Sequence, residues 1–166
     1  FGVSEVIRNV MEAQVAYPIT KIRTAKIFVG IPALIYQYKL KIARSSLLGT
    51  FIGILPGAGA DIAAWLAYAV SKRTSKEPEK YGFGSIEAIA GSTTANNACL
   101  AGAWVPAMVF GIPGDSITAI VIGVLFMKGL RPGPMIFERN PEIVYGVYFS
   151  FLLANLLLLP LGCLLY

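Results

Sequence analysis

The sequence predicts an all-α membrane protein, a polytopic helical bundle with discontinuous helices. Three observations support this fold class. The 166 residues are 56% hydrophobic and only 14% charged, whereas soluble domains usually carry about 25% charged residues. The few charges are clustered, because residues 45–70 contain Asp61 as their one charged side chain. Finally, a Pro-Gly pair interrupts two of the apolar stretches, at residues 56–57 and 113–114.

Residues 1–44 are predicted to form a cytoplasmic or interfacial segment. They hold seven of the fourteen Lys and Arg residues, and their apolar piece 27–36 has only ten residues. A membrane span needs about 20 residues, so this piece is expected at the membrane interface. The net charge of +5 does not indicate nucleic-acid binding, because no basic stripe alternates with stacking aromatic residues.

Residues 45–166 are predicted to form a transmembrane transport domain. Its first apolar stretch, 45–70, is flanked by Lys and Arg at both ends. Cytoplasmic loops carry the Lys and Arg excess, so both ends are expected on the cytoplasmic side. This favours a re-entrant hairpin with arms 45–55 and 62–70 and its tip at the break between them. A kinked helix that spans the whole membrane is the alternative.

The later elements follow from the same pattern. Residues 71–84 form a polar loop, and 85–110 are apolar but rich in small and hydroxyl side chains, which let helices approach closely in lipid. A short apolar arm, 116–130, follows the second break. A loop then runs to about residue 142, and the uncharged stretch 143–165 is the clearest predicted span.

The two breaks are the predicted binding site. Proline removes a helix hydrogen bond and glycine relaxes the backbone, so each helix should stop and restart there. A restarting helix offers free N–H groups and the positive end of its dipole, which bind carboxylates or phosphates. Paired breaks of this kind indicate a transporter binding site. The predicted substrate-binding residues are Pro56, Gly57, Ala58, Gly59, Asp61, Asn96, Asn97, Pro113, Gly114, Asp115 and Ser116.

Asp61 and Asp115 each follow a break inside an apolar stretch. A carboxylate in lipid costs roughly 2.5–3.5 kcal/mol on insertion scales, so it suggests a functional site. The alternative is local, because an Asp at a helix start can simply cap the free N–H groups.

Amide and hydroxyl oxygens near the breaks suit a hard monovalent cation. The predicted Na⁺ ligands are Asn96, Asn97, Asp115 and Thr118. The alternative role for such residues is hydrogen bonding between helices. No cofactor is expected beyond Na⁺ or H⁺ as a coupling ion, and no enzymatic activity is expected. The glycine-rich sequence PGAGAD lacks the Lys and Ser or Thr of a phosphate-binding loop, and the chain has no His.

Several uncommon motifs occur in an order that resembles the large membrane subunit of the tripartite tricarboxylate transporters, TctA. They are GTFIGILPGAGADIAAWLAYAVSKRTSKEPEKYGFGSIEA (49–88), ANNA (95–98) and VPAMVFGIPGDSITAIVIGVLFMKGLRPGP (105–134). The resemblance is to the carboxy-terminal part of such a subunit. The family signatures fall on Pro56–Ala60 and Gly111–Gly114, and Glu87, Asn96 and Asn97 match as well. At Ser92-Thr93 the chain departs from the family, which usually has Pro-Glu.

The resemblance implies a multi-pass protein of the bacterial inner membrane. Such a protein would import small carboxylates, tricarboxylate-type organic acids, by secondary active transport coupled to an ion gradient, often sodium. A periplasmic solute-binding protein would deliver the substrate, and a small membrane subunit and membrane lipid would be further partners. Two alternatives are a passive anion channel and a membrane scaffold that transports nothing.

Overall fold

The computed structural model describes residues 3–4, 7, 10–11 and 30–165. The chain divides into two units, Phe1–Leu34 and Ile35–Tyr166, and each is described by itself. Most of the predicted surface segment in the first unit lies outside the described residues, so that assignment stays a prediction.

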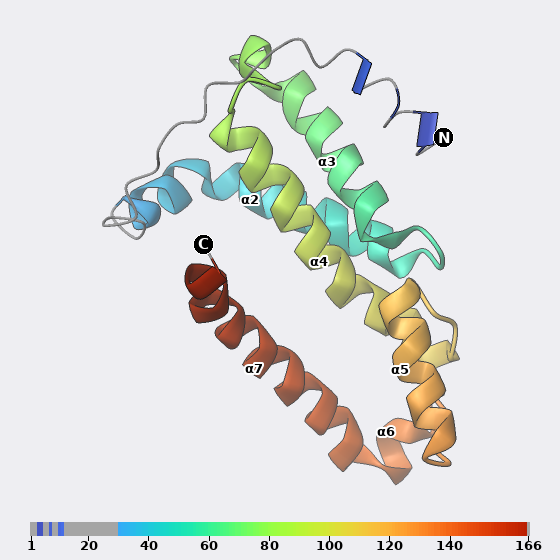
Figure 1. Cartoon of the computed structure of the whole chain (residues 1–166). Coiled ribbons are helices and arrows are strands. Elements are labelled where there is room, and N and C mark those ends of the chain that lie inside the picture. The colour runs from blue at the N-terminus through green and yellow to red at the C-terminus, as the bar shows by residue number, and fades with distance from the viewer. Residues whose placement is uncertain (1–2, 5–6, 8–9, 12–29, 166) are drawn as a thin grey trace. The chain divides into compact units, whose positions relative to one another are not determined.

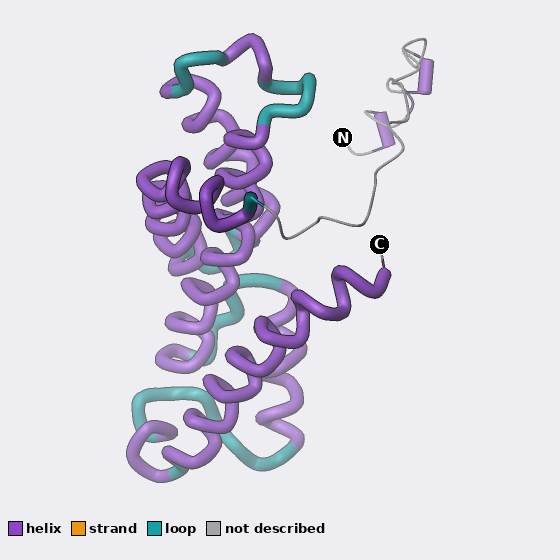
Figure 2. The backbone as a smooth tube through the Cα atoms, turned by 90° about the vertical axis from the view of Figure 1, so that its left-hand side faces the viewer, coloured by secondary structure: helices purple, strands orange, loops and turns teal. Residues whose placement is uncertain are grey.

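The described part of the chain is all-helical, as the sequence predicts (Figures 1 and 2). A short 3₁₀-helix, η2, lies in the loop between α3 and α4. The elements are α2 (Ile31–Ile54), α3 (Gly59–Thr74), η2 (Pro78–Lys80), α4 (Ile86–Phe110), α5 (Ser116–Met127), α6 (Ile136–Arg139) and α7 (Pro141–Leu165).

Helices end and restart at both Pro-Gly pairs, between α2 and α3 and between α4 and α5. The backbone φ angle is +80° at Gly57, +73° at Gly59 and +68° at Gly111. Side chains other than glycine rarely adopt such angles, so these turns require glycine. Helices α2 and α3 are longer than the predicted arms, because both continue through the charged residues that flank the apolar stretch.

Helices α2 and α3 fold back on each other. At their open end, Arg44 Nη1 donates a hydrogen bond of 2.6 Å to Thr74 Oγ1. The connecting break lies at the other end of the pair (Figure 1). The residues on either side of the apolar stretch 45–70 therefore lie together, and the stretch is a hairpin in this structure. Helix α2 also runs without interruption through the domain boundary predicted at residue 44.

Small residues form the contact between the hairpin and α4. Each helix buries a stripe of them at a spacing of four residues, which places them on one helix face. The stripes are Ser45, Gly49 and Gly53 on α2, Ala63, Ala67 and Ser71 on α3, and Gly91, Ala95 and Cys99 on α4. A Cβ atom on Gly49 would collide with the carbonyl oxygen of Ala95, and one on Gly53 with that of Cys99. These helices therefore pack backbone against backbone, as is common in membrane bundles.

A second cluster joins the later helices. It consists of the buried residues Met108, Leu125, Ile136 and Val144, which come from α4, α5, α6 and α7. Within the described residues, one helix is long and apolar enough to cross a membrane, at Pro141–Gly162 of α7. This agrees with the span predicted at 143–165.

Candidate functional site

The two breaks contact each other, with Gly57 on the exposed side of the contact. The backbone N–H of Gly57 donates a hydrogen bond of 3.0 Å to the carbonyl oxygen of Gly114. Gly114 is buried, and a Cβ atom there would lie 2.7 Å from the Cβ of Ala103 on α4. Only glycine allows the second break to approach α4 this closely. The hairpin tip, the middle of α4 and the start of α5 thus meet at one point.

The start of α5 has a capping box formed by Asp115 and Thr118. The Thr118 backbone N–H donates to Asp115 Oδ1 at 2.7 Å. The backbone N–H groups of Gly114 and Asp115 both donate to Thr118 Oγ1 at 3.0 Å. Thr118 is only 1% exposed, and Asp115 is half-buried.

This capping changes what the second break can bind. The sequence predicts free N–H groups near Gly114, but those of Gly114 and Asp115 already have partners within the cap. The carboxylate of Asp115 also occupies the position where a bound anion would lie. Cation coordination by Asp115 and Thr118 stays a prediction, and Ser116 is exposed beside them.

The start of α3 differs from that of α5. Its N-cap residue, Ala58, provides no side-chain hydrogen bond, and Asp61 lies in the first turn. The first N–H groups of a helix have no partner inside it, so this break offers donors to a negative group. Pro56 is exposed here and Gly59 half-buried.

Asn96 and Asn97 point to different neighbours. Asn96 Nδ2 donates a hydrogen bond of 3.4 Å to the carbonyl oxygen of Ala60, in the first turn of α3. Asn97 instead lines a cavity of about 490 Å³ together with Asn155 of α7. Adjacent helix residues diverge by about 100°, so one Asn lies at the break and the other does not.

Asp61 lines a different cavity from Asn97. That cavity measures about 410 Å³, and Trp65 and Tyr68 of α3 and Ser92 of α4 also line it. The structure therefore places the predicted residues in three locations. The two breaks with Asn96 form one, Asp61 faces the second, and Asn97 lies in the third.

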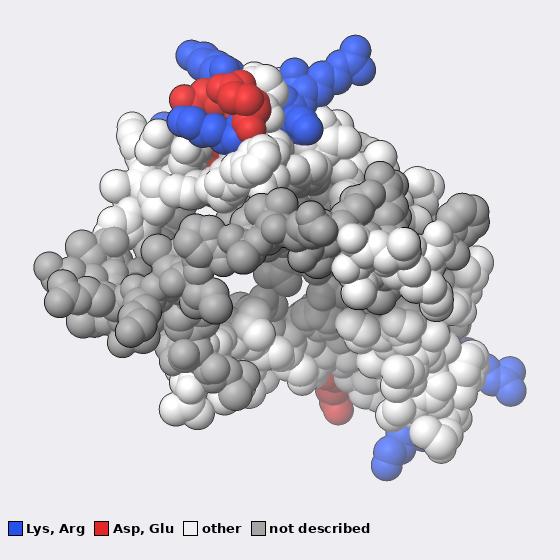
Figure 3. All heavy atoms as spheres, turned by 45° about the horizontal axis from the view of Figure 1, so that its top comes forward, with Lys and Arg blue, Asp and Glu red and all other residues white. Residues whose placement is uncertain are grey.

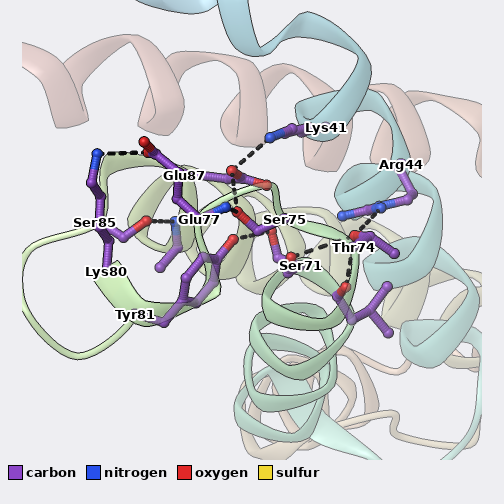
Figure 4. A network of polar contacts seen from close by, with 12 residues as sticks. Lys41, Arg44, Ser71, Thr74, Ser75, Glu77, Lys80, Tyr81, Ser85 and Glu87 are labelled. Atoms are coloured by element: carbon purple, nitrogen blue, oxygen red, sulfur yellow. Dashed lines mark hydrogen bonds and ion pairs between the residues drawn. The ribbon is translucent and has the colours of Figure 1, made fainter.

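A polar network at the open end of the hairpin was not predicted (Figure 4). Lys41 Nζ lies 2.6 Å from Glu87 Oε2, and Ser75 Oγ donates to the same oxygen at 3.0 Å. Nearby, the Tyr81 hydroxyl donates to Ser71 Oγ at 3.0 Å. The sequence placed Glu87 near the end of an apolar stretch, but nothing in the pattern named Lys41 as its partner.

Glu87 lies in the first turn of α4, beside the polar loop and outside the candidate span. Burial by itself raises the pKa of this carboxyl group. The hydrogen bonds from Lys41 and Ser75 and the charge of Lys41 outweigh burial and lower its pKa below the ordinary value. Glu87 is therefore ionised at neutral pH in this structure.

Comparison with known proteins assigns the family. The sequence profile of the "Tripartite tricarboxylate transporter TctA family" matches residues 1–166. The chain belongs to the TctA family. This confirms the resemblance seen in the motifs, and it makes the chain a member of a transporter family rather than of an enzyme family. Membership also implies association with a membrane.

Two similar proteins come from Agrobacterium vitis. One, described as an uncharacterized 52.8 kDa protein in the TAR-I ttuC' 3' region, is 36% identical over 121 residues. The other, an uncharacterized protein in the TAR-II ttuC' 3' region, is 36% identical over 114 residues. These matches cover 73% and 69% of this TctA chain but only 24% and 47% of the relatives. The comparison with solved structures found no match.

Proposed function

We propose that this chain forms part of a secondary active transporter that moves small carboxylates across the bacterial inner membrane. Family membership supports the transporter class. The observation that carries the proposal is the hydrogen bond between the two breaks, from Gly57 to Gly114. Irregular backbone at membrane depth is tolerated only where protein buries it or where it lines a cavity, and such breaks typically form transporter binding sites.

The charge distribution supports an orientation in the membrane. Lys and Arg gather at the open end of the hairpin and in the adjoining loop (Figure 3). They are Lys39, Lys41, Arg44, Lys72, Arg73, Lys76 and Lys80. Near α6, at the opposite end, the basic residues are Lys128, Arg131 and Arg139. By the positive-inside rule the open end of the hairpin faces the cytoplasm.

In this orientation the hairpin is re-entrant. Helix α3 has 16 residues, and at 1.5 Å per residue its length is roughly 24 Å. Part of that length lies among charged residues at the cytoplasmic end. Because the hydrocarbon core is about 30 Å thick, the tip at Gly57 lies well inside it. There the uncapped start of α3 meets the second break.

The chemistry of this tip suits a carboxylate. The uncapped N–H groups around Gly59 and Asp61 supply donors and a positive helix end. A cation that travels with the substrate offsets part of its negative charge against the membrane potential, about 2.3 kcal/mol per charge per 100 mV. Oxygens of Asn96, Asp115 and Thr118, near the breaks, are proposed ligands for that cation, Na⁺ or H⁺ being the coupling ion. Asn97 is a proposed ligand at a separate position, in the cavity that it shares with Asn155.

The test is uptake of labelled citrate and malate by the full-length protein in proteoliposomes, with its small membrane subunit and periplasmic solute-binding protein supplied. We expect accumulation against the concentration gradient that depends on sodium at fixed pH, or on pH at fixed sodium. Uptake that never exceeds electrochemical equilibrium would instead identify a passive channel. No uptake of either acid under any gradient would leave a scaffold role and refute the proposal.

A further inference from the structure

The structure contains a polar cavity that the two breaks do not explain. It lies between α2, α4 and α7, with a volume of about 490 Å³, and is lined by Ser46, Thr94, Asn97 and Asn155 among apolar residues. We propose that this cavity is a second binding site for the carboxylate substrate, on a different face of α4 from Asn96. The inference rests on the proposed transport function and adds Ser46, Thr94 and Asn155 to the site.

The hydrogen bonding of the lining residues supports a ligand. Elsewhere on α4 and α7, hydroxyl groups are satisfied by their own helix: Thr93 Oγ1 donates to the Ile89 carbonyl at 2.6 Å and Ser150 Oγ to that of Gly146 at 2.8 Å. The side chains of Ser46, Thr94 and Asn97 make no hydrogen bond to another described residue. Ser46 and Thr94 are half-buried and Asn97 is exposed, so their polar groups are open to a solute in the cavity.

Asn155 adds a group from the opposite wall of the cavity. Its Nδ2 donates a hydrogen bond of 2.9 Å to the carbonyl oxygen of Phe151 within α7. Amide groups carry two N–H donors and one acceptor oxygen, so a donor and the oxygen of Asn155 are left for a ligand. Asn155 and Asn97, on different helices, can thus hold the two ends of one small molecule.

The lining also selects the chemistry of the ligand. It contains no Asp or Glu, which would repel an anion, and no Lys or Arg. Amide N–H and hydroxyl groups donate to carboxylate oxygens, while their own oxygens can accept from a hydroxyl group of the same solute or contact a monovalent cation. This combination fits a small hydroxylated carboxylate. We expect a cation to enter with it, because the uncharged lining does not neutralise the negative charge of the carboxylate.

Adjacent threonines on α4 provide a matched test. Thr94 lines the cavity, whereas Thr93 bonds to its own helix and does not line it. Thr94→Val and Asn155→Leu remove ligand donors, and Thr93→Val is the control with the same change of atoms. The measurement is equilibrium binding of labelled citrate and labelled malate to the full-length protein in nanodiscs, in sodium chloride, together with thermal stability.

We expect Thr94→Val and Asn155→Leu each to weaken binding by roughly three- to ten-fold, the usual effect of one lost hydrogen bond. Thr93→Val should bind as the wild type does. Wild-type affinity in both cavity variants, or an equal loss of affinity in all three variants, would overturn the inference. The transport function would still hold in that case if the wild-type protein takes up the acids. Absence of both binding and uptake in the wild type would instead refute the transport function itself.

Discussion

Lys41 Nζ and Glu87 Oε2 lie 2.6 Å apart and join the hairpin to the first turn of α4. The side chain of Glu87 is 10% exposed and that of Lys41 35% exposed. The pair therefore lies in a partly desolvated position at the polar end of the bundle. It fixes the relative position of two elements whose other contacts are made almost entirely by small residues.

Removing the cation of this pair should destabilise the protein. In Lys41→Met the carboxylate of Glu87 stays buried without its partner, and we expect a loss of about 1–2 kcal/mol. This is less than the 3–5 kcal/mol for a fully buried pair, because Lys41 is partly solvated. Thermal unfolding in detergent measures it. The exposed pair of Lys80 and Glu77 is the control, and Glu77→Gln should not change the unfolding temperature measurably.

The pH dependence of stability should follow the lowered pKa of Glu87. A carboxyl group whose pKa is lower in the folded state stabilises the fold above its unfolded pKa, and this stabilisation is lost as pH falls through the folded value. We expect the contribution of Glu87 to be full above its ordinary pKa of 4.5, to decrease as the pH falls below that value, and to disappear once the pH is below the lowered pKa of the folded state. Glu87→Gln should remove that part of the acid sensitivity. An identical acid profile in the variant would show that other groups cause it.

The contact between α2 and α4 predicts a strong effect of one methyl group. Gly53→Ala places a Cβ against the Cys99 carbonyl, where backbone must move, and overpacking of this kind costs about 1–3 kcal/mol. A Cβ on Gly123, also within a helix, meets no atom within 4 Å, so Gly123→Ala should be tolerated. Yield of monodisperse protein and the unfolding temperature compare the two variants. Equal behaviour would show that the helices are not this close.

The second break should depend on the hydroxyl group of Thr118. In Thr118→Val the N–H groups of Gly114 and Asp115 lose their acceptor, at a cost of about 1–3 kcal/mol for the buried group of Gly114. Thr118→Ser keeps the acceptor and should retain most of the stability and uptake. If valine and serine variants were equally stable, the cap seen here would not hold the break in place.

Asn97 tests the proposed transport site without disturbing a described hydrogen bond. We expect Asn97→Ala to reduce sodium-dependent uptake about ten-fold, which corresponds to one lost interaction of roughly 1.4 kcal/mol. Membrane insertion and the unfolding temperature should stay at their wild-type values. Uptake in proteoliposomes at fixed pH measures the effect, and wild-type rates in the variant would exclude Asn97 from the site.

Local backbone chemistry made much of the fold predictable. Proline and glycine act within their own helix turn, so the ends of α2 and α4 and the starts of α3 and α5 could be predicted from Pro56-Gly57 and Pro113-Gly114. The extent of α2 could not be predicted in this way. Lys39, Lys41 and Arg44 end the apolar stretch and so suggest a boundary, although Lys and Arg are good helix formers. The helix continues through them.

The candidate site was less predictable than the fold. The sequence could name Asp115 as either a ligand or a cap, since both roles use the same carboxylate. The hydrogen bonds to Thr118 satisfy the cap. The cavity shared by Asn97 and Asn155 had no signal in the sequence, because the two residues lie on helices whose relative placement is not encoded by any local pattern.

The sequence by itself determined that the chain is apolar, helical, interrupted twice by Pro-Gly and basic near one end of its first hairpin, because these properties depend on residue type and near neighbours. Only the tertiary structure decided that Gly57 bonds to Gly114, and that Asn96 and Asn97 serve different locations. Those outcomes depend on which small-residue faces come into contact. An apolar chain has many helix faces with nearly the same hydropathy, so hydropathy cannot tell which faces will contact each other. These faces differ only in how closely their backbones can pack.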